Sequence, residues 1–199
     1  MSFSKGQGLQ LLMIPSSSSD PKIINSNEED RLTIEKVIKG QKAAFSILFS
    51  KYQRLVRINI WNFFRKKDLV DDLCQEAFEK AFLALESLKN PEKFKSWILQ
   101  ITYRLCVDYQ RSNVGQEKTQ AILQNSIEKN VSLDLSNLFK EESILYLLEQ
   151  LSQIDGLIVC LRYIEDFEYQ EISEILGISE PTIRQKASRA IRQLRSCLK

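Results

Sequence analysis

Apolar residues recur every three or four positions along most of the chain beyond Glu28. This spacing matches the 3.6-residue turn of an α-helix, and the periodic segments lack the alternating, β-branched runs that mark strands. Glycine and proline, the residues that most often interrupt helices, account for only 6 and 4 of the 199 residues. The pattern therefore predicts an all-α fold.

Two stretches depart from the helical pattern and divide the chain. Residues 1–27 are rich in Ser, Gly, Pro and Asn and carry too few apolar groups to bury, so we expect a disordered leader there. Residues 112–137 are polar and weakly periodic, which predicts a flexible linker. The sequence thus predicts two small helical domains, one at 28–111 and one at 138–199.

The first helical block separates its charges by sign. Seven basic residues and no acid occur from Gln41 to Lys67, whereas Asp68–Leu88, a predicted helix, carries six acids and one base. A helical projection of that acidic helix gathers its small and apolar residues on one side and most of its acids on the other. Leu83 falls among the acids. A solvated polar face with one stray Leu is one interpretation, and a docking surface for a basic partner is the other.

The C-terminus carries a helix-turn-helix pattern. Tyr169–Leu176 and Pro181–Leu198 have helical periodicity, and Gly177–Ser179 reads as a tight turn between them. Gly177 tolerates the left-handed backbone that ends a helix. Pro181 fits the first turn of the next helix, because the amide hydrogen that proline lacks would have no partner there. Breakers and periodicity agree on two helices joined by a short turn.

The second of these helices combines an apolar stripe with a basic exposed face. Six residues after Glu180 are basic and none is acidic, which suits the phosphates of duplex DNA. Arg and Gln in the N-terminal half of such a helix can contact base edges in the major groove. We expect direct readout from Arg184, Gln185, Ser188 and Arg189. A basic helix that merely faces solvent is the alternative interpretation.

Composition excludes several kinds of chemistry. Histidine is absent, which removes the commonest general base and metal ligand. The four cysteines lie far apart and form no Cys-x-x-Cys pair, so we expect free thiols. A glycine-rich phosphate loop, a metal-spaced carboxylate set and a catalytic motif are missing as well. We therefore expect no catalytic residue, no cofactor and no metal site.

Charge and hydropathy bear on partners and location. The net charge is only +2, so any attraction to nucleic acid depends on how the charge is distributed. The apolar run Leu9–Ile14 is too short to span a membrane, and no small-residue cleavage site follows it. We expect no membrane insertion and a cytoplasmic location, where the thiols stay reduced.

Three motifs resemble those of one family. Tyr163–Leu194, which reads YIEDFEYQEISEILGISEPTIRQKASRAIRQL, resembles region four of bacterial RNA polymerase sigma factors. Val70–Phe82, which reads VDDLCQEAFEKAF, resembles the region-two helix that docks on the polymerase clamp. Phe94–Arg111, which reads FKSWILQITYRLCVDYQR, resembles the segment that opens and reads the minus-ten element. The sequence predicts no third domain between the region-two and region-four domains. In this respect the chain is similar to the compact extracytoplasmic-function, or group four, sigma factors.

This resemblance implies an alternative sigma factor that binds core RNA polymerase through the β′ clamp and the β flap, reads promoter DNA and is controlled by an anti-sigma factor. The residues implied in core polymerase binding are Asp71, Asp72, Gln75, Glu76, Glu79 and Leu83. Those implied at the minus-ten element are Lys93, Lys95, Tyr103, Arg104 and Arg111. Those implied at the minus-thirty-five element are Thr182, Arg184, Gln185, Lys186, Ser188, Arg189 and Arg192.

Two other functions fit parts of the sequence. A free-standing helix-turn-helix regulator would bind DNA through the C-terminal domain and use the N-terminal block for sensing or dimerisation. The one-signed charge of Asp68–Leu88 argues against a dimer seam there, because like charges would face each other. An enzyme that uses carboxylates alone is the other alternative, and no catalytic motif supports it.

Overall fold

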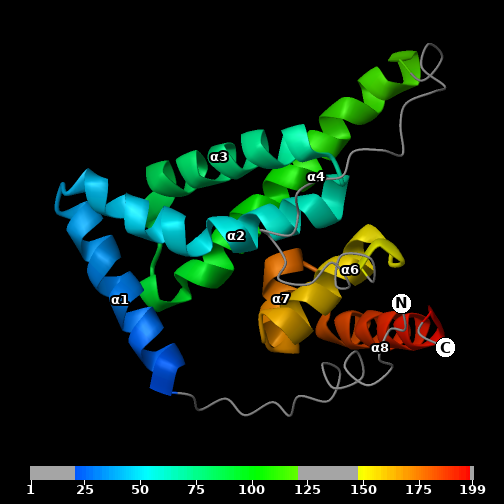
Figure 1. Ribbon diagram of the computed structural model, residues 1–199. Coiled ribbons are helices and arrows are strands. Elements are labelled where there is room, and N and C mark those ends of the chain that lie inside the picture. The colour runs from blue at the N-terminus through cyan, green and yellow to red at the C-terminus, as the bar shows by residue number, and fades with distance from the viewer. Residues whose placement is uncertain (1–20, 121–147, 198–199) are drawn as a thin grey trace, which may run out of the picture.

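The computed structural model describes residues 21–120 and 148–197, and every element within these ranges is a helix (Figure 1). The predicted all-α fold is confirmed for this part of the chain. The N-terminal unit comprises α1 (Pro21–Ile38), α2 (Phe45–Phe64), α3 (Lys67–Ala84) and α4 (Phe94–Gln120), with short 3-10 turns η2 (Lys42–Ala44), η3 (Leu85–Ser87) and η4 (Pro91–Lys93). The C-terminal unit comprises α6 (Gln153–Val159), the π-helix η6 (Cys160–Ile164), α7 (Tyr169–Leu176) and α8 (Glu180–Cys197).

Helices α2, α3 and α4 pack against one another in the N-terminal unit. The apolar stripe predicted for the acidic helix faces inward, where Leu73, Ala77 and Phe78 of α3 are buried. Ile58 of α2 and Ile98 of α4 are fully buried in the same core. Burying this apolar surface supplies the main stabilisation of the unit.

Two helices extend beyond the predicted domain boundaries. Helix α1 begins at Pro21, inside the stretch predicted as a disordered leader, and α4 continues to Gln120, past the expected end at Arg111. The polar start of α1 does not show which contacts hold this helix in place. Asp30 is buried in α1, pairs with Lys51 at 2.5 Å and accepts a hydrogen bond from the Tyr52 hydroxyl. Residues 1–20 of the leader and 121–137 of the predicted linker lie outside the described residues.

The C-terminal unit contains the predicted helix-turn-helix. Helix α7 has the predicted bounds, and Gly177 ends it in the left-handed conformation with φ 65°. Helix α8 then packs its stripe of Ile183, Ala187 and Leu194 into the core. The hydroxyl of Ser152 accepts a hydrogen bond from the Asp155 amide at 3.2 Å and caps α6.

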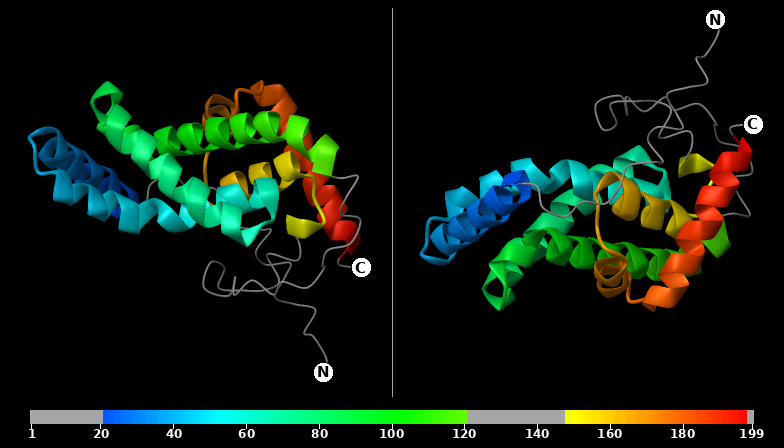
Figure 2. Two further views of the ribbon diagram at one scale, coloured as in Figure 1. Left: turned by 90° about the horizontal axis from the view of Figure 1, so that it is seen from above. Right: turned by 90° about the horizontal axis from the view of Figure 1, so that it is seen from below.

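The two units pack directly on each other, a feature that the sequence pattern does not predict. Helix α2 contacts α6, and α4 contacts α7, so the helices of the two units lie against one another (Figure 2). One buried apolar cluster runs through both units. Gln153 Nε2 donates a hydrogen bond to the Phe63 carbonyl at 2.6 Å, and Arg65 Nη2 donates one to the Leu148 carbonyl at 2.9 Å. The first bond satisfies a carbonyl group in the last turn of α2, which has no partner within the helix.

Cysteine chemistry follows from this packing. Cys74, Cys106 and Cys160 are buried free thiols, as the sequence predicts. Burial raises the pKa of the Cys106 thiol from 9.0 to about 12 and raises the pKa of Cys160 as well. Neither thiol forms an appreciable amount of thiolate at neutral pH, so both pack as small apolar groups.

Substitutions at Gly177 test why glycine occupies the turn. The backbone conformation, rather than a lack of space for a side chain, is the proposed reason. A Cβ at this position would meet no heavy atom within 4 Å, so only the left-handed φ opposes a side chain. We expect Gly177→Ala to lower the free energy of unfolding by about 1 kcal/mol. Gly177→Asn should lower it less, because Asn adopts this conformation more readily. Urea denaturation measures both, and equal stability of the Ala variant and the wild type would contradict the argument.

Candidate nucleic-acid and protein-binding surfaces

The outward side of α3 is acidic. Its members are the six residues predicted for partner binding, which we call the acidic docking face: Asp71, Asp72, Gln75, Glu76, Glu79 and Leu83. Local contacts already hold some of these side chains, since Arg57 pairs with Asp71 and Glu76 lies 3.3 Å from Lys80 Nζ. Gln75 donates a hydrogen bond to Glu79 at 2.9 Å. Asp72 is exposed and has no side-chain partner among the described residues.

Leu83 stands at the edge of an apolar groove beside these acids. Its side chain is 83% exposed, the highest value among the exposed large hydrophobic residues of the described chain. The groove has a volume of about 400 Å³, and Gln75, Glu79 and Leu83 border it. Four aromatic rings line it, which we call the phenylalanine groove: Phe45 and Phe49 of α2 with Phe78 and Phe82 of α3. An exposed apolar patch with a polar rim marks an interaction surface.

Sequence reasoning missed the half of this groove that α2 contributes. Phe45 and Phe49 are four positions apart and therefore lie on one face of the helix. Their rings meet those of α3 at centroid distances of 5.1 Å for Phe45 with Phe82 and 4.8 Å for Phe49 with Phe78. The aromatic spacing is visible in the sequence, but its partner helix is not. Only the packing of α2 on α3 makes it part of a surface.

Helix α8 presents most of the predicted DNA-reading residues to solvent. The exposed members are Arg184, Gln185, Ser188, Arg189 and Arg192, while Thr182 is half-buried. Lys186 was expected to point outward with the other basic residues of α8, and it does not. It is half-buried, and its Nζ lies 3.4 Å from Oδ1 of the buried Asp155. This ion pair ties α8 to α6 and orients Lys186 towards the interior of the unit.

Arg184 is held in place by two neighbours. Its guanidinium pairs with Glu180 at 2.6 Å, one turn earlier in α8. The same group lies 4.5 Å from the ring centroid of Tyr169, within the range of a cation–π contact. Sequence reasoning missed Tyr169, because a residue on α7 shows its relation to α8 only after the two helices fold together. A fixed guanidinium loses less side-chain entropy when it binds a base edge or a phosphate.

The five residues predicted at the minus-ten element lie on α4 or just before it. They form two groups, one exposed and one half-buried. Lys93, Arg104 and Arg111 are exposed, and at about 100° per residue they share one side of the helix. Lys95 and Tyr103 project from other sides and are half-buried. The Tyr103 ring lies 5.6 Å from that of Phe63, and burial raises the pKa of its hydroxyl.

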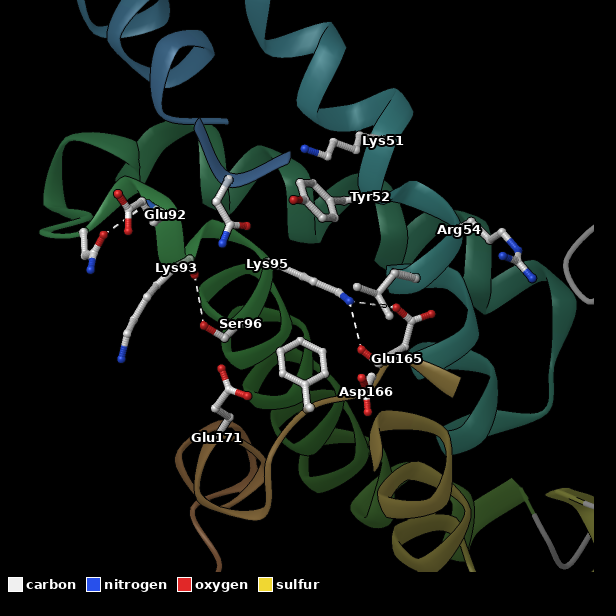
Figure 3. Close-up of a pocket in the computed structure, with 14 residues that line it drawn as sticks. Lys51, Tyr52, Arg54, Glu92, Lys93, Lys95, Ser96, Glu165, Asp166 and Glu171 are labelled. Carbon is white, nitrogen blue, oxygen red and sulfur yellow. Dashed lines mark hydrogen bonds and ion pairs between the residues drawn. The ribbon is translucent and has the colours of Figure 1, made fainter. Parts of the chain in front are cut away.

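Lys95 points across a cleft to the C-terminal unit (Figure 3). Its Nζ lies 3.0 Å from Glu165 Oε2 and donates a hydrogen bond to the Glu165 carbonyl at 3.2 Å. The cleft has a volume of about 720 Å³. Basic side chains from the N-terminal unit border it at Lys51, Arg54, Lys93 and Lys95, and acidic ones from the C-terminal unit at Glu165, Asp166 and Glu171. Opposite charges therefore meet where the two units join.

Other kinds of site are not apparent in the described residues. Across residues 21–120 and 148–197, the structure brings together no group of three side chains able to hold a metal ion. No helix in these ranges is long and apolar enough to cross a membrane. The surfaces that stand out are the acidic docking face with its groove, the α8 face and the cleft beside α4.

Comparison with known proteins assigns both units. Residues 48–115 match the family described as Sigma-70 region 2, and residues 141–194 match Sigma-70, region 4. The chain is 29% identical over 135 residues to RNA polymerase sigma factor SigV of Bacillus subtilis strain 168, covering 68% of this chain and 79% of that protein. It is 28% identical over 172 residues to the ECF RNA polymerase sigma-E factor of Escherichia coli K12, covering 81% and 90% respectively.

Solved structures share the fold. CnrH in complex with the cytosolic domain of CnrY has a TM-score of 0.60 at 19% identity, covering 85% of this chain and 96% of that chain. The sigma factor RpoE in complex with the anti-sigma factor NepR from Bartonella quintana has a TM-score of 0.62 at 21% identity, covering 77% and 96%. With regions 2 and 4 in this order and relatives of this kind, the chain belongs to the sigma-70 family and is a sigma factor of the extracytoplasmic-function type.

Proposed function

We propose that this chain is an alternative sigma factor that docks on core RNA polymerase through α3 and directs initiation by contacting promoter DNA with α4 and α8. The observation that carries the proposal is the presence of regions 2 and 4 on one chain, with an acidic surface on the first and a basic one on the second. Such a protein binds core polymerase and positions it on the promoter, and it makes or breaks no covalent bonds itself. It works in the cytoplasm, where the polymerase and the chromosome are.

The acidic docking face and the phenylalanine groove together suit a basic, partly apolar partner. Leu83 and the four rings supply the apolar centre that an interface needs, and Gln75 and Glu79 supply a polar rim. The β′ clamp of core polymerase is the proposed partner for this surface, and the β flap is the proposed partner of the C-terminal unit. The match to region 2 supports this assignment over a free-standing regulator, because it accounts for the N-terminal unit.

The exposed face of α8 suits the major groove at the minus-thirty-five element. Gln185 lies in its N-terminal half, from which a recognition helix contacts bases, and Arg189 lies at its middle, one turn further along. Arg184 is held ready by Glu180 and Tyr169, and Arg192 extends the same basic face towards the phosphates. We assign base contacts to Arg184, Gln185, Ser188 and Arg189, and we assign backbone contacts to Thr182 and Arg192. Lys186 is left out of the set because Asp155 holds it towards the interior of the unit.

At the minus-ten element we assign phosphate contacts to Lys93, Arg104 and Arg111, which share an exposed side of the helix. Lys95 and Tyr103 complete the proposed set once the C-terminal unit moves away from them. Regulation by a separate protein also belongs to the proposal. Two similar structures are complexes of this kind, CnrH with the cytosolic domain of CnrY and RpoE with the anti-sigma factor NepR.

Transcription in vitro tests the proposal as a whole. Purified chain mixed with bacterial core polymerase should start RNA at defined sites on a random promoter library, because the polymerase lacks promoter specificity of its own. Sequencing the 5′ ends of the transcripts gives the positions and the shared upstream elements. Core polymerase alone is the control. The absence of chain-dependent start sites would refute the function.

Charge reversal tests the acidic docking face. We expect Asp72→Lys with Glu76→Lys to abolish association with core polymerase, because two attractive charges become repulsive against a basic partner. Size-exclusion co-elution measures the association, and circular dichroism checks the fold. A charge-matched control is Glu29→Lys with Asp108→Lys, at two exposed acids outside α3. Undiminished co-elution of the α3 variant, or equal loss in the control, would contradict the assignment.

Arginine removal tests base readout by α8. We expect Arg189→Ala to relax sequence preference at one or two minus-thirty-five positions, at a cost of about 1–3 kcal/mol for the preferred base. Arg195→Ala, at an exposed position in the last turn, should weaken all sequences by the same small factor. Binding of the two variants to a panel of minus-thirty-five sequences separates these effects. Identical profiles would remove Arg189 from the readout set.

A further inference from the structure

The ring of Tyr169, the first residue of α7, lies against the guanidinium of Arg184 on α8. We propose that Tyr169 is a positioning residue for the minus-thirty-five element. Its ring keeps the Arg184 guanidinium in place while that group exchanges the carboxylate of Glu180 for the edge of a base. The proposal rests on the function given above, and it adds a residue of α7 that acts on base readout through α8.

The Tyr169 ring is held firmly enough to serve as a support. The helix start that carries it is fixed by a capping box at Glu168. The ring is half-buried, and a second guanidinium, that of Arg162, lies 5.1 Å from its centroid. Arg162 is fixed in turn, because its side chain is only 14% exposed and donates a hydrogen bond to the Phe167 carbonyl at 3.1 Å. The ring therefore has little freedom to move away from Arg184.

Arg184 has one contact that a base would replace and one that a base would leave in place. Its Nε and Nη2 lie 2.8 Å and 2.6 Å from Oε1 of Glu180. The acceptor atoms on the edge of a guanine bind the same N–H donors, so Glu180 and a base compete for them. The contact with the Tyr169 ring depends on the positive charge rather than on particular donors, so it persists when the acceptor changes.

The ring, rather than the hydroxyl, carries this role. The Tyr169 hydroxyl lies 3.5 Å from the Tyr163 hydroxyl, at the outer limit of a hydrogen bond. The ring centroid lies 4.5 Å from the Arg184 guanidinium carbon, well within the range of a cation–π contact. Removing the hydroxyl alone should therefore leave Arg184 in place, whereas removing the ring should release it.

The effect of the ring should be confined to one base position. Arg189 is five residues beyond Arg184, which places it about 7.5 Å further along the helix axis and about 140° around it. The Tyr169 ring that contacts Arg184 is therefore not a support for Arg189. Side-chain entropy lost before binding is not lost again on binding, so only the contact made by Arg184 gains from the ring.

Nuclear magnetic resonance on the full-length chain tests the contact itself. Protons above an aromatic ring resonate upfield of their usual position. The δ-methylene protons of Arg184 should therefore keep their resonance in Tyr169→Phe and move downfield in Tyr169→Leu, with circular dichroism as the check on folding. An Arg184 resonance that does not move in Tyr169→Leu would overturn the proposal, whatever the chain does with DNA.

Binding of the complex with core polymerase to promoters that differ at single minus-thirty-five positions tests the consequence. Tyr169→Leu should reduce discrimination at the position read by Arg184 by roughly twofold to fivefold, the range of an exposed cation–π contact. Discrimination at the position read by Arg189 should not change, and Tyr169→Phe is the matched control that keeps the ring. Equal weakening on every promoter, or the same loss in Tyr169→Phe, would show a different role and overturn positioning.

A double-mutant cycle shows whether Tyr169 acts through Arg184. In an Arg184→Ala background, Tyr169→Leu should have no further effect on discrimination. Glu180→Gln should tighten binding in the wild type more than in Arg184→Ala, because its carboxylate competes for that guanidinium. Additive effects of Tyr169→Leu and Arg184→Ala would overturn the positioning role, and an equal gain from Glu180→Gln in both backgrounds would overturn the exchange.

The Arg184→Ala variant also separates this role from the function on which it rests. If it leaves every minus-thirty-five preference unchanged, base readout by Arg184 is wrong and the positioning role falls with it. If Arg184→Ala alters a preference and Tyr169→Leu does not, the positioning role alone is wrong and readout by α8 stands.

Discussion

The packing of α2 and α4 against α6 and α7 is the contact that sets how the proposed surfaces of the two units lie relative to each other. It joins the two units through one buried apolar cluster and decides which side chains face solvent. Leu83 stays outside this contact and Tyr103 lies within it, although both are large residues on helices of the same unit. The same packing therefore covers Tyr103 and leaves Leu83 accessible.

Segregation of charge distinguishes the two proposed surfaces. Helix α3 carries acids on its outer side, and α8 carries bases, so a balanced total charge conceals two strongly charged faces. The two signs also meet inside the molecule, where Lys95 of α4 faces Glu165. The same principle that attracts external partners thus operates between the units. An internal partner has the advantage of high effective concentration, which partly compensates for the weakness of a single ion pair.

Much of the local structure was predictable because it depends on neighbouring residues alone. The bounds of α7, the left-handed Gly177 and the buried stripe of α3 follow from spacing and backbone preferences that act within one or two turns. The surfaces were only partly predictable. Asp72 and Arg189 are exposed as expected, since polar residues opposite an apolar stripe face solvent.

The remaining features depend on contacts between residues far apart in the chain. Lys186 belongs to a basic run, but Asp155, 31 residues earlier, turns it inward. Lys95 and Glu165 are separated by 70 residues, and no periodicity relates them. The buried Asp30 likewise depends on Lys51 and Tyr52 of another helix. A one-dimensional pattern shows which side of a helix is apolar, but it does not show which neighbour covers it.

The contact between the units contains polar groups as well as apolar ones. Gly156 brings α6 close to α2, where an added Cβ would lie 3.2 Å from Asn62 Oδ1. That oxygen is buried without a hydrogen-bond partner among the described residues, an arrangement that costs about 1–3 kcal/mol. Asn62 and the ion pair of Lys95 with Glu165 are better solvated when the units part, whereas Leu157 and Ile175 are better buried when they meet. The contact between the units therefore combines favourable apolar burial with a buried polar group that has no hydrogen-bond partner among the described residues.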